Sequence, residues 1–113
     1  MSSERFDELV SEALDTIPEE LARLVENVVV LVEDDSPPDG PTLLGLYQGV
    51  PLTERDSRYT MAMPDRIMIF RRPILHMCRS AAEVVEQVRI TVVHEIAHYF
   101  GIDDARLHEL GYG

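Results

Sequence analysis

The sequence has few of the features that stabilise or anchor a protein outside the cytoplasm. Cys78 is the only cysteine among the 113 residues, so no intrachain disulfide can form, and a disulfide-stapled secreted protease is excluded. No apolar run approaches the roughly 20 residues needed to cross a bilayer. The N-terminal stretch MSSERFDELVSEAL is acidic and amphipathic, unlike the basic start and apolar core of a signal peptide. We therefore expect a cytoplasmic protein.

Positive charge is scarce as well. The ten cationic side chains, all arginine, face 21 acidic residues, which gives a formal net charge of −11. The imbalance is concentrated in residues 1–40, which hold 12 acids and two arginines, whereas residues 41–113 hold nine acids and eight arginines. Such acidity repels phosphate backbones and anionic lipids. We expect no nucleic-acid partner and no membrane partner, and we interpret the acidic half as a solvated helix face.

The apolar pattern predicts one domain, residues 1–113, made of helices and short strands. Thr16 is expected to cap the second helix, and the valine-rich run after it is expected to be a buried strand. The predicted order is helix 3–15, helix 16–27, a strand within NVVVLVED (27–34), loop 34–42, strand 43–49, loop 51–65, strand 66–70, short helix 71–79, long helix 80–100 and short helix 103–110. This order indicates an α+β fold in which a small three-stranded sheet packs on helices.

The long helix carries the most informative motif, VVHEIAHYFGIDD. Ser80 and Glu83 form a capping box at its start, and Gly101 suits the left-handed position just past its end. His94 and His98 are four residues apart and therefore lie on one helix face, where both imidazoles can bind a single zinc ion. Glu95 lies one residue further round the axis and suits a general base rather than a ligand. The alternative is that the two histidines are half-buried and hydrogen-bonded to protein.

A catalytic zinc ion needs a third protein ligand. Gly101 lets the chain reverse after the helix, and Asp104 then completes the spacing H-E-x-x-H-x-x-G-x-x-D. Asp103 is interpreted as a helix cap or as a partner to a ligating histidine, although either aspartate could cap the last helix. His108 could replace or assist Asp104, or it could simply be exposed.

Two tyrosines near the motif could each have either a catalytic or a packing role. Tyr99 and Tyr112 could each donate a phenol hydrogen bond to an oxyanion, although we interpret each as a packing residue. Cys78 has no histidine at a motif spacing and is not expected to be a ligand or a nucleophile. Mn²⁺, Fe²⁺, Co²⁺ and Ni²⁺ also accept a His₂Asp ligand set, so the composition does not select zinc alone.

The segment HEIAHYFGIDD resembles the extended zinc motif of the metzincin metallopeptidases, with aspartate in place of the third histidine. More narrowly, three segments resemble the very small bacterial zincin-like metallopeptidases: LLGLYQGVPLTER, MPDRIMIFRRPIL and VRITVVHEIAHYFGIDDARLHELGYG. The resemblance covers nearly all of the chain beyond about residue 25. It implies a minimal zincin fold, with His94, His98 and Asp104 as metal ligands and Glu95 as the catalytic acid/base. No methionine follows Asp104, whereas metzincins have a methionine-containing turn there.

The expected function is a zinc-dependent metallopeptidase acting on a peptide or protein, with one ion per chain. Zincins commonly bind extended peptides at a sheet edge, and either 43–49 or 66–70 could be that edge. One alternative is a non-catalytic domain that binds metal or a partner. Another is a metal-dependent endoribonuclease, because a ribosomal-RNA-maturation family has the similar pattern H-x-x-x-H-x-x-G-x-D-H. Glu95 in place of that family's glycine, and the lack of a basic tract, argue against the endoribonuclease.

Overall fold

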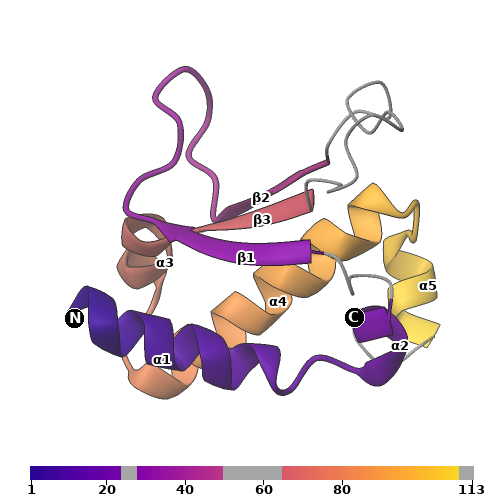
Figure 1. Cartoon of the computed structure of the whole chain (residues 1–113), viewed down its shortest axis with the longest axis horizontal. Coiled ribbons are helices and arrows are strands. Elements are labelled where there is room, and N and C mark those ends of the chain that lie inside the picture. Colours follow the sequence, from indigo (N-terminus) through magenta and orange to yellow (C-terminus); the bar gives the residue numbers. More distant parts are fainter. Residues whose placement is uncertain (24–27, 50–64, 110–113) are drawn as a thin grey trace, which may run out of the picture.

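The computed structural model of the chain describes residues 1–23, 28–49 and 65–109, except for the side chain of Asp104. Figure 1 shows the arrangement of its helices and strands. In chain order these are α1 (Ser3–Leu14), α2 (Glu19–Ala22), β1 (Val28–Glu33), β2 (Gly45–Gln48), β3 (Asp65–Phe70), α3 (Arg71–Met77), α4 (Ala81–Tyr99) and α5 (Asp104–Glu109). The predicted α+β class with a small three-stranded sheet is confirmed. The loop predicted at 51–65 lies almost wholly outside the described residues.

The three strands form one mixed sheet in the order β1-β3-β2. β1 runs parallel to β3, with Val28 opposite Asp65, and β2 runs antiparallel to β3, with Tyr47 opposite Ile67. β3 is therefore the central strand, and among the described strands β1 and β2 are the edges. The structure thus chooses between the two candidate edges near the motif: residues 66–70 are internal, and β2 is the edge.

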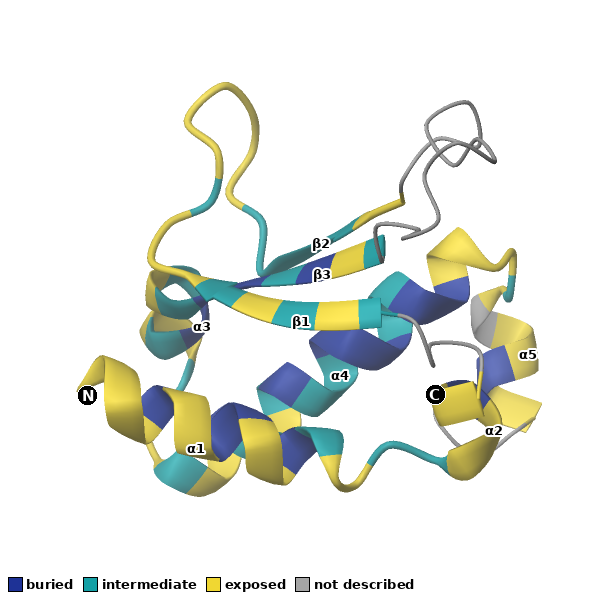
Figure 2. Cartoon of the chain, viewed as in Figure 1, coloured by how far each residue is buried: buried dark blue, intermediate teal, exposed yellow. Residues whose placement is uncertain are grey.

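The helices cover one side of this sheet. α4 packs against β2 and β3, and α1 packs against α4, so that both helices lie below the sheet in Figure 1. Figure 2 shows buried residues along α4, β3 and α1. The core consists of Phe6, Leu9, Val10, Ala13, Leu21, Ile67, Ile69, Ile74, Val84, Val88, Val92, Val93, Ile96, Ala97 and Leu107. α4 therefore lies between sheet and α1 and is fixed from both sides.

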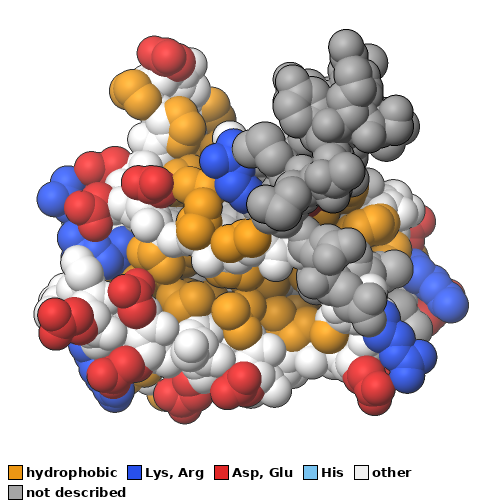
Figure 3. Space-filling view, viewed as in Figure 1, with side chains coloured by type: hydrophobic (Ala, Val, Ile, Leu, Met, Phe, Trp, Pro, Cys, Tyr) orange, Lys and Arg blue, Asp and Glu red, His pale blue; other side chains and the backbone are white. Residues whose placement is uncertain are grey.

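The opposite side of the sheet is much less covered. Along β1 the residues alternate between half-buried and exposed, and Val29 and Leu31 keep 39% and 37% of their surface accessible. Figure 3 shows apolar side chains on this part of the surface. The expectation that β1 is a buried strand was therefore wrong: its residues alternate between half-buried and exposed, and among the described elements the helices pack on only one face of the sheet.

α4 begins and ends as its sequence predicts. The Ser80 hydroxyl accepts a hydrogen bond from the backbone N–H of Glu83 at 3.2 Å, while the Glu83 carboxylate accepts one from the backbone N–H of Arg79. At the other end Gly101 has φ +72°. The N–H of Ile102 donates to the carbonyl of Ala97 at 2.7 Å, which is the long hydrogen bond of a Schellman motif. The glycine thus turns the chain back towards the helix it has just left.

The start of α2 differs from the prediction. Its N-cap is Pro18, with no side-chain cap, and the hydroxyl of Thr16 donates back to the carbonyl of Ala13 at 2.7 Å. Thr16 therefore completes the end of α1 instead of starting α2. This choice is available because a threonine hydroxyl can bond to nearby backbone groups on either side.

None of the helices in the described parts of the chain has both the length and the apolar character required to cross a membrane.

Candidate metal site

His94 and His98 present two adjacent imidazoles in the last two turns of α4. Their ring centroids are 6.2 Å apart and their planes are inclined by 11°. His94 is half-buried and His98 is exposed, and neither imidazole hydrogen-bonds to another residue of the described chain. The alternative of histidines satisfied by protein hydrogen bonds therefore has no support in this part of the molecule. Two open imidazoles on one helix face match the donor chemistry that zinc requires.

Glu95 faces the edge strand rather than the histidines. One carboxylate oxygen, Oε1, accepts a hydrogen bond from the backbone N–H of Tyr47 at 3.0 Å, across 48 residues of sequence. In an antiparallel pair of strands, only every second residue directs its N–H and C=O to the partner strand. Leu44 is such a residue in this sheet, because its carbonyl accepts a hydrogen bond from the N–H of Phe70. Tyr47 lies three residues after Leu44, an odd number, so its N–H points away from β3. The donor at the sheet edge is thus directed at the proposed general base.

The close approach of β2 and α4 is explained by the residues on their facing surfaces. Thr91, Glu95 and Tyr99 follow one another at intervals of four and share a helix face. The facing positions of β2 and its end are Gly45, Tyr47 and Gly49, at intervals of two. A Cβ on Gly45 would lie 2.6 Å from Cγ2 of Thr91 and 3.0 Å from the carbonyl oxygen of Met68. The approach therefore depends on the absence of a side chain at Gly45.

An aromatic cluster continues this contact beyond Glu95. The rings of Tyr47 and Tyr99 stack with centroids 3.9 Å apart and planes inclined by 18°. Phe100 meets Tyr99 edge to face at 5.2 Å and Tyr47 at 6.3 Å. The Tyr47 hydroxyl donates to Asp65 Oδ2 at 2.8 Å, which fixes this ring to β3. Tyr99 and Phe100 remain 48% and 41% exposed, so the end of α4 offers an accessible aromatic surface next to the histidines.

The residues proposed as the third ligand lie in and around α5. Asp103 Oδ1 accepts a hydrogen bond from the backbone N–H of Arg106 at 2.8 Å, the bond expected of a helix cap. Asp104 is the first residue of α5, but its side chain is outside what the structure describes. His108 is exposed on α5. Tyr112 lies outside the described residues. The bond shows Asp103 in the role of helix cap, one of the two roles predicted for it.

A complete ligand set is not assembled within the described side chains. Among them no group of three His, Cys, Asp or Glu residues is close enough to hold a metal ion. His94 and His98 supply two donors, and the third proposed donor, Asp104, is the one whose side chain the structure does not describe. The two donors that are described fit zinc in their chemistry, because imidazole nitrogens are among its usual ligands.

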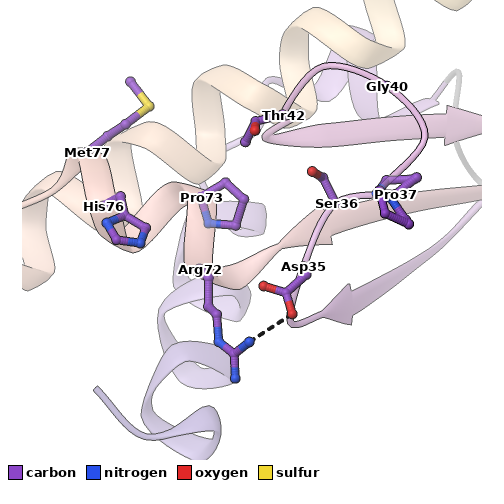
Figure 4. Close-up of a pocket in the computed structure, with 10 residues that line it drawn as sticks. Asp35, Ser36, Pro37, Gly40, Thr42, Arg72, Pro73, His76 and Met77 are labelled. Atoms are coloured by element: carbon purple, nitrogen blue, oxygen red, sulfur yellow. Dashed lines mark hydrogen bonds and ion pairs between the residues drawn. The ribbon is translucent and has the colours of Figure 1, made fainter.

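A separate pocket lies at the opposite end of the sheet, between the 34–42 loop and α3. Its volume is about 620 Å³. His76, Pro73 and Thr42 are among the residues that line it (Figure 4). The Arg72 guanidinium there is paired with the Asp35 carboxylate at 2.8 Å. The pocket contains none of the motif residues, and its one cationic side chain is already paired, so we assign the chemistry to the end of α4.

Sequence reasoning missed Tyr47 and Gly45 as parts of the site. It identified 43–49 as a candidate edge strand, but it gave Gly45 and Tyr47 no role there. The alternation G-x-Y-x-G was a usable signal, because small residues on one strand face often mark the place where another element approaches closely. The partner of Tyr47 could not be found this way, since a backbone donor carries no side-chain signature.

Comparisons with known proteins identify a family and a related fold. A family model described as Zincin-like metallopeptidase matches residues 25–113. No curated protein matches the chain. Among solved structures, a conserved hypothetical protein from Thermus thermophilus is similar in fold, with a TM-score of 0.58 and 23% identity over 88% of this chain and 94% of that one. Its title names no activity, so the likeness concerns the fold.

Proposed function

Because the chain belongs to the zincin-like metallopeptidase family, we propose that it hydrolyses peptide bonds with the help of one zinc ion. The observation that carries the proposal is the pair of open imidazoles, His94 and His98, beside a glutamate whose carboxylate is held in place. His94, His98 and Asp104 would hold the ion. When bound, zinc supplies Lewis-acid polarisation of the scissile carbonyl and makes water a better nucleophile near neutral pH.

Glu95 performs the proton transfers in this proposal. Its Oε1 is engaged by the N–H of Tyr47, which leaves Oε2 to accept a proton from the attacking water. The same carboxyl group then delivers that proton to the departing amine. Since the Glu95 side chain is half-buried and held at one oxygen, its carboxylate needs little rearrangement between the two transfers.

The edge position of β2 supports a peptide as substrate. An extended peptide can add to a sheet edge through main-chain hydrogen bonds, with alternate side chains directed to each face. Because Glu95 occupies the outward N–H of Tyr47, the peptide would bond to the other outward main-chain groups of β2. Side chains directed towards α4 would meet the aromatic surface of Tyr99 and Phe100, which is exposed next to this edge. Exposed adjacent aromatic rings favour apolar contacts. We therefore propose a peptide with a large apolar side chain near the cleaved bond, acted on in the cytoplasm.

The direct test is the variant Glu95→Gln in zinc-reconstituted protein, screened against a peptide library. The expected result is an unchanged zinc content and a loss of turnover of at least about 100-fold, the lower range for removal of a general base. The library should show cleavage next to large apolar residues in the parent. His98→Ala, purified identically, reports any contaminating protease.

Two results would contradict the proposal. Turnover retained by a clean Glu95→Gln preparation would exclude the mechanism. A parent that holds zinc and cleaves no peptide of the library would favour the non-catalytic alternative, a metal-binding or partner-binding domain.

A further inference from the structure

The contact between β2 and α4 contains a feature that catalysis by Glu95 would need and that the motif itself does not supply. In H-E-x-x-H the glutamate is one residue away from a ligand, but nothing in the motif fixes its carboxylate. Here the carboxylate is held from outside the helix, at 3.0 Å, by the backbone N–H of Tyr47. Charge-assisted hydrogen bonds of this kind are stronger than neutral ones and more restrictive in geometry.

This hydrogen bond depends on how closely the two elements approach. Gly45 lies two residues before Tyr47 on the same face of β2, directly against Thr91 and with Glu95 Cγ 3.8 Å from where its Cβ would be. An added Cβ would meet Thr91 Cγ2 at 2.6 Å and the Met68 carbonyl oxygen at 3.0 Å. Neither neighbour can easily move, since Thr91 is 7% exposed and the Met68 carbonyl belongs to the central strand.

We infer that Gly45 is a positioning residue for the reaction, which lets β2 approach α4 closely enough for the Tyr47 N–H to anchor the Glu95 carboxylate. This inference rests on the proposed function for its catalytic consequence, although the anchoring itself is a structural statement. Gly45 touches neither the metal ligands nor, as we envisage it, the reacting atoms. Its substitution should therefore alter the rate of the chemical step and leave zinc binding intact.

The anchoring is tested by the amide resonance of Tyr47 in ¹⁵N-labelled, zinc-reconstituted protein. An amide proton bonded to a carboxylate resonates downfield, and Glu95→Ala should move it upfield. Gly45→Ala should move the same resonance in the same direction, because the added Cβ separates the strand from the helix. Gly40→Ala is the matched control, since a Cβ at Gly40 would meet nothing within 4 Å, and it should leave the Tyr47 amide unchanged.

The catalytic consequence is tested on the peptides that the parent cleaves. Gly45→Ala should lower kcat by up to about 100-fold, the scale of a 1 Å misplacement of a catalytic group, with KM and zinc content close to the parent's. Thr91→Ser removes the methyl group that the new Cβ would meet and keeps the hydroxyl. The double variant Gly45→Ala/Thr91→Ser should therefore recover part of kcat and return the Tyr47 amide towards its parental position.

The outcomes separate this inference from the proposed function. If Glu95→Ala leaves the Tyr47 amide unmoved, the anchoring is absent and the inference is wrong, whether or not peptides are cleaved. If Gly45→Ala moves the amide but kcat is unchanged, Gly45 has no positioning role. If Gly45→Ala does not fold, the double variant Gly45→Ala/Thr91→Ser is measured in its place. The inference would be overturned by a folded double variant in which the Tyr47 amide resonance is parental but kcat is as low as that of Glu95→Gln.

Discussion

At the scale of single residues, neighbours in the motif have different partners. His94 and His98 have imidazoles without hydrogen bonds to the described chain, Glu95 is bonded to the sheet edge, and Asp103 is bonded to the backbone of α5. A side chain already committed to the backbone is a poor candidate for a metal ligand. We therefore predict that Asp103 is a cap, and that Asp104, placed by the spacing of the motif, is the third ligand.

Replacement of each candidate by alanine should separate ligand from cap. Asp103→Ala should lower the free energy of unfolding by about 1 kcal/mol, the usual cost of losing an N-cap, and should keep zinc. Asp104→Ala should weaken zinc binding by at least about 100-fold, beyond the 10–100-fold typical of groups outside the ligand set. His108→Ala should change neither. Competition with a zinc-binding dye and denaturant unfolding measure the two quantities.

The assignment of Asp104 would be overturned by the opposite pattern. If His108→Ala or Asp103→Ala releases zinc while Asp104→Ala retains it, the third ligand is the histidine or the first aspartate.

Cys78 provides a prediction about pH. Burial raises the pKa of the Cys78 thiol, and the negative charge of Glu83 raises that pKa further. A raised pKa means that less thiolate, the reactive form, is present at a given pH above neutrality. Cys78 should therefore react with a disulfide reagent more slowly than a free cysteine at pH 8. The midpoint of its pH–rate profile should lie at a higher pH than that of the free thiol. A rate equal to or above that of free cysteine would contradict the described environment.

At the scale of secondary-structure elements, the end of α4 determines where the chain can go next. Gly101 adopts φ +72°, a conformation in which residues with a Cβ are strained. The hydrogen bond from the N–H of Ile102 to the carbonyl of Ala97 then directs the chain towards α5 and Asp104. The turn thus connects the two histidines proposed as ligands to the proposed third ligand.

Gly101→Ala should therefore affect stability and the metal together. We expect the free energy of unfolding to fall by about 1–2 kcal/mol, the cost of a left-handed conformation for an L-residue, and the zinc affinity to fall as Asp104 is displaced. Gly40→Ala, in an open loop, should leave stability unchanged or slightly higher. Thermal unfolding with and without zinc measures both effects. A Gly101→Ala variant with parental zinc affinity would show that Asp104 is not held by this turn.

The elements also show what the sequence could and could not predict. Local signals suffice for α4, because Ser80, Glu83 and Gly101 act on the backbone within a few residues. They fail for Thr16, whose hydroxyl had bonding options on both sides. The contact of Tyr47 with Glu95 joins residues 48 positions apart. The strand order likewise depends on distant pairs, such as Val28 with Asp65, and no local pattern encodes either pairing. The close approach of Gly45 to Thr91 of α4 could not be predicted either, because it also joins residues far apart in the sequence.

At the scale of the whole molecule, α4 is held between a sheet and a second helix while its last turns reach the surface. The buried side chains of α1 pack against it, and the acidic residues of α1, among them Glu4, Asp7, Glu8 and Glu12, are exposed. This agrees with the interpretation of the acidic N-terminal half as a solvated face. The fold therefore supports a rigid helix whose end carries His94, Glu95 and His98 beside an edge strand.

The central claim is that His94 and His98 bind a metal ion, and metal content tests it most directly. Plasma mass spectrometry should be applied to the parent, His98→Ala and His76→Ala, all reconstituted with zinc and dialysed identically. His76 is an exposed histidine on α3 and serves as the matched control. The account predicts about one zinc per chain in the parent and in His76→Ala, and none in His98→Ala. No zinc in the parent, or equal zinc in His98→Ala, would contradict it.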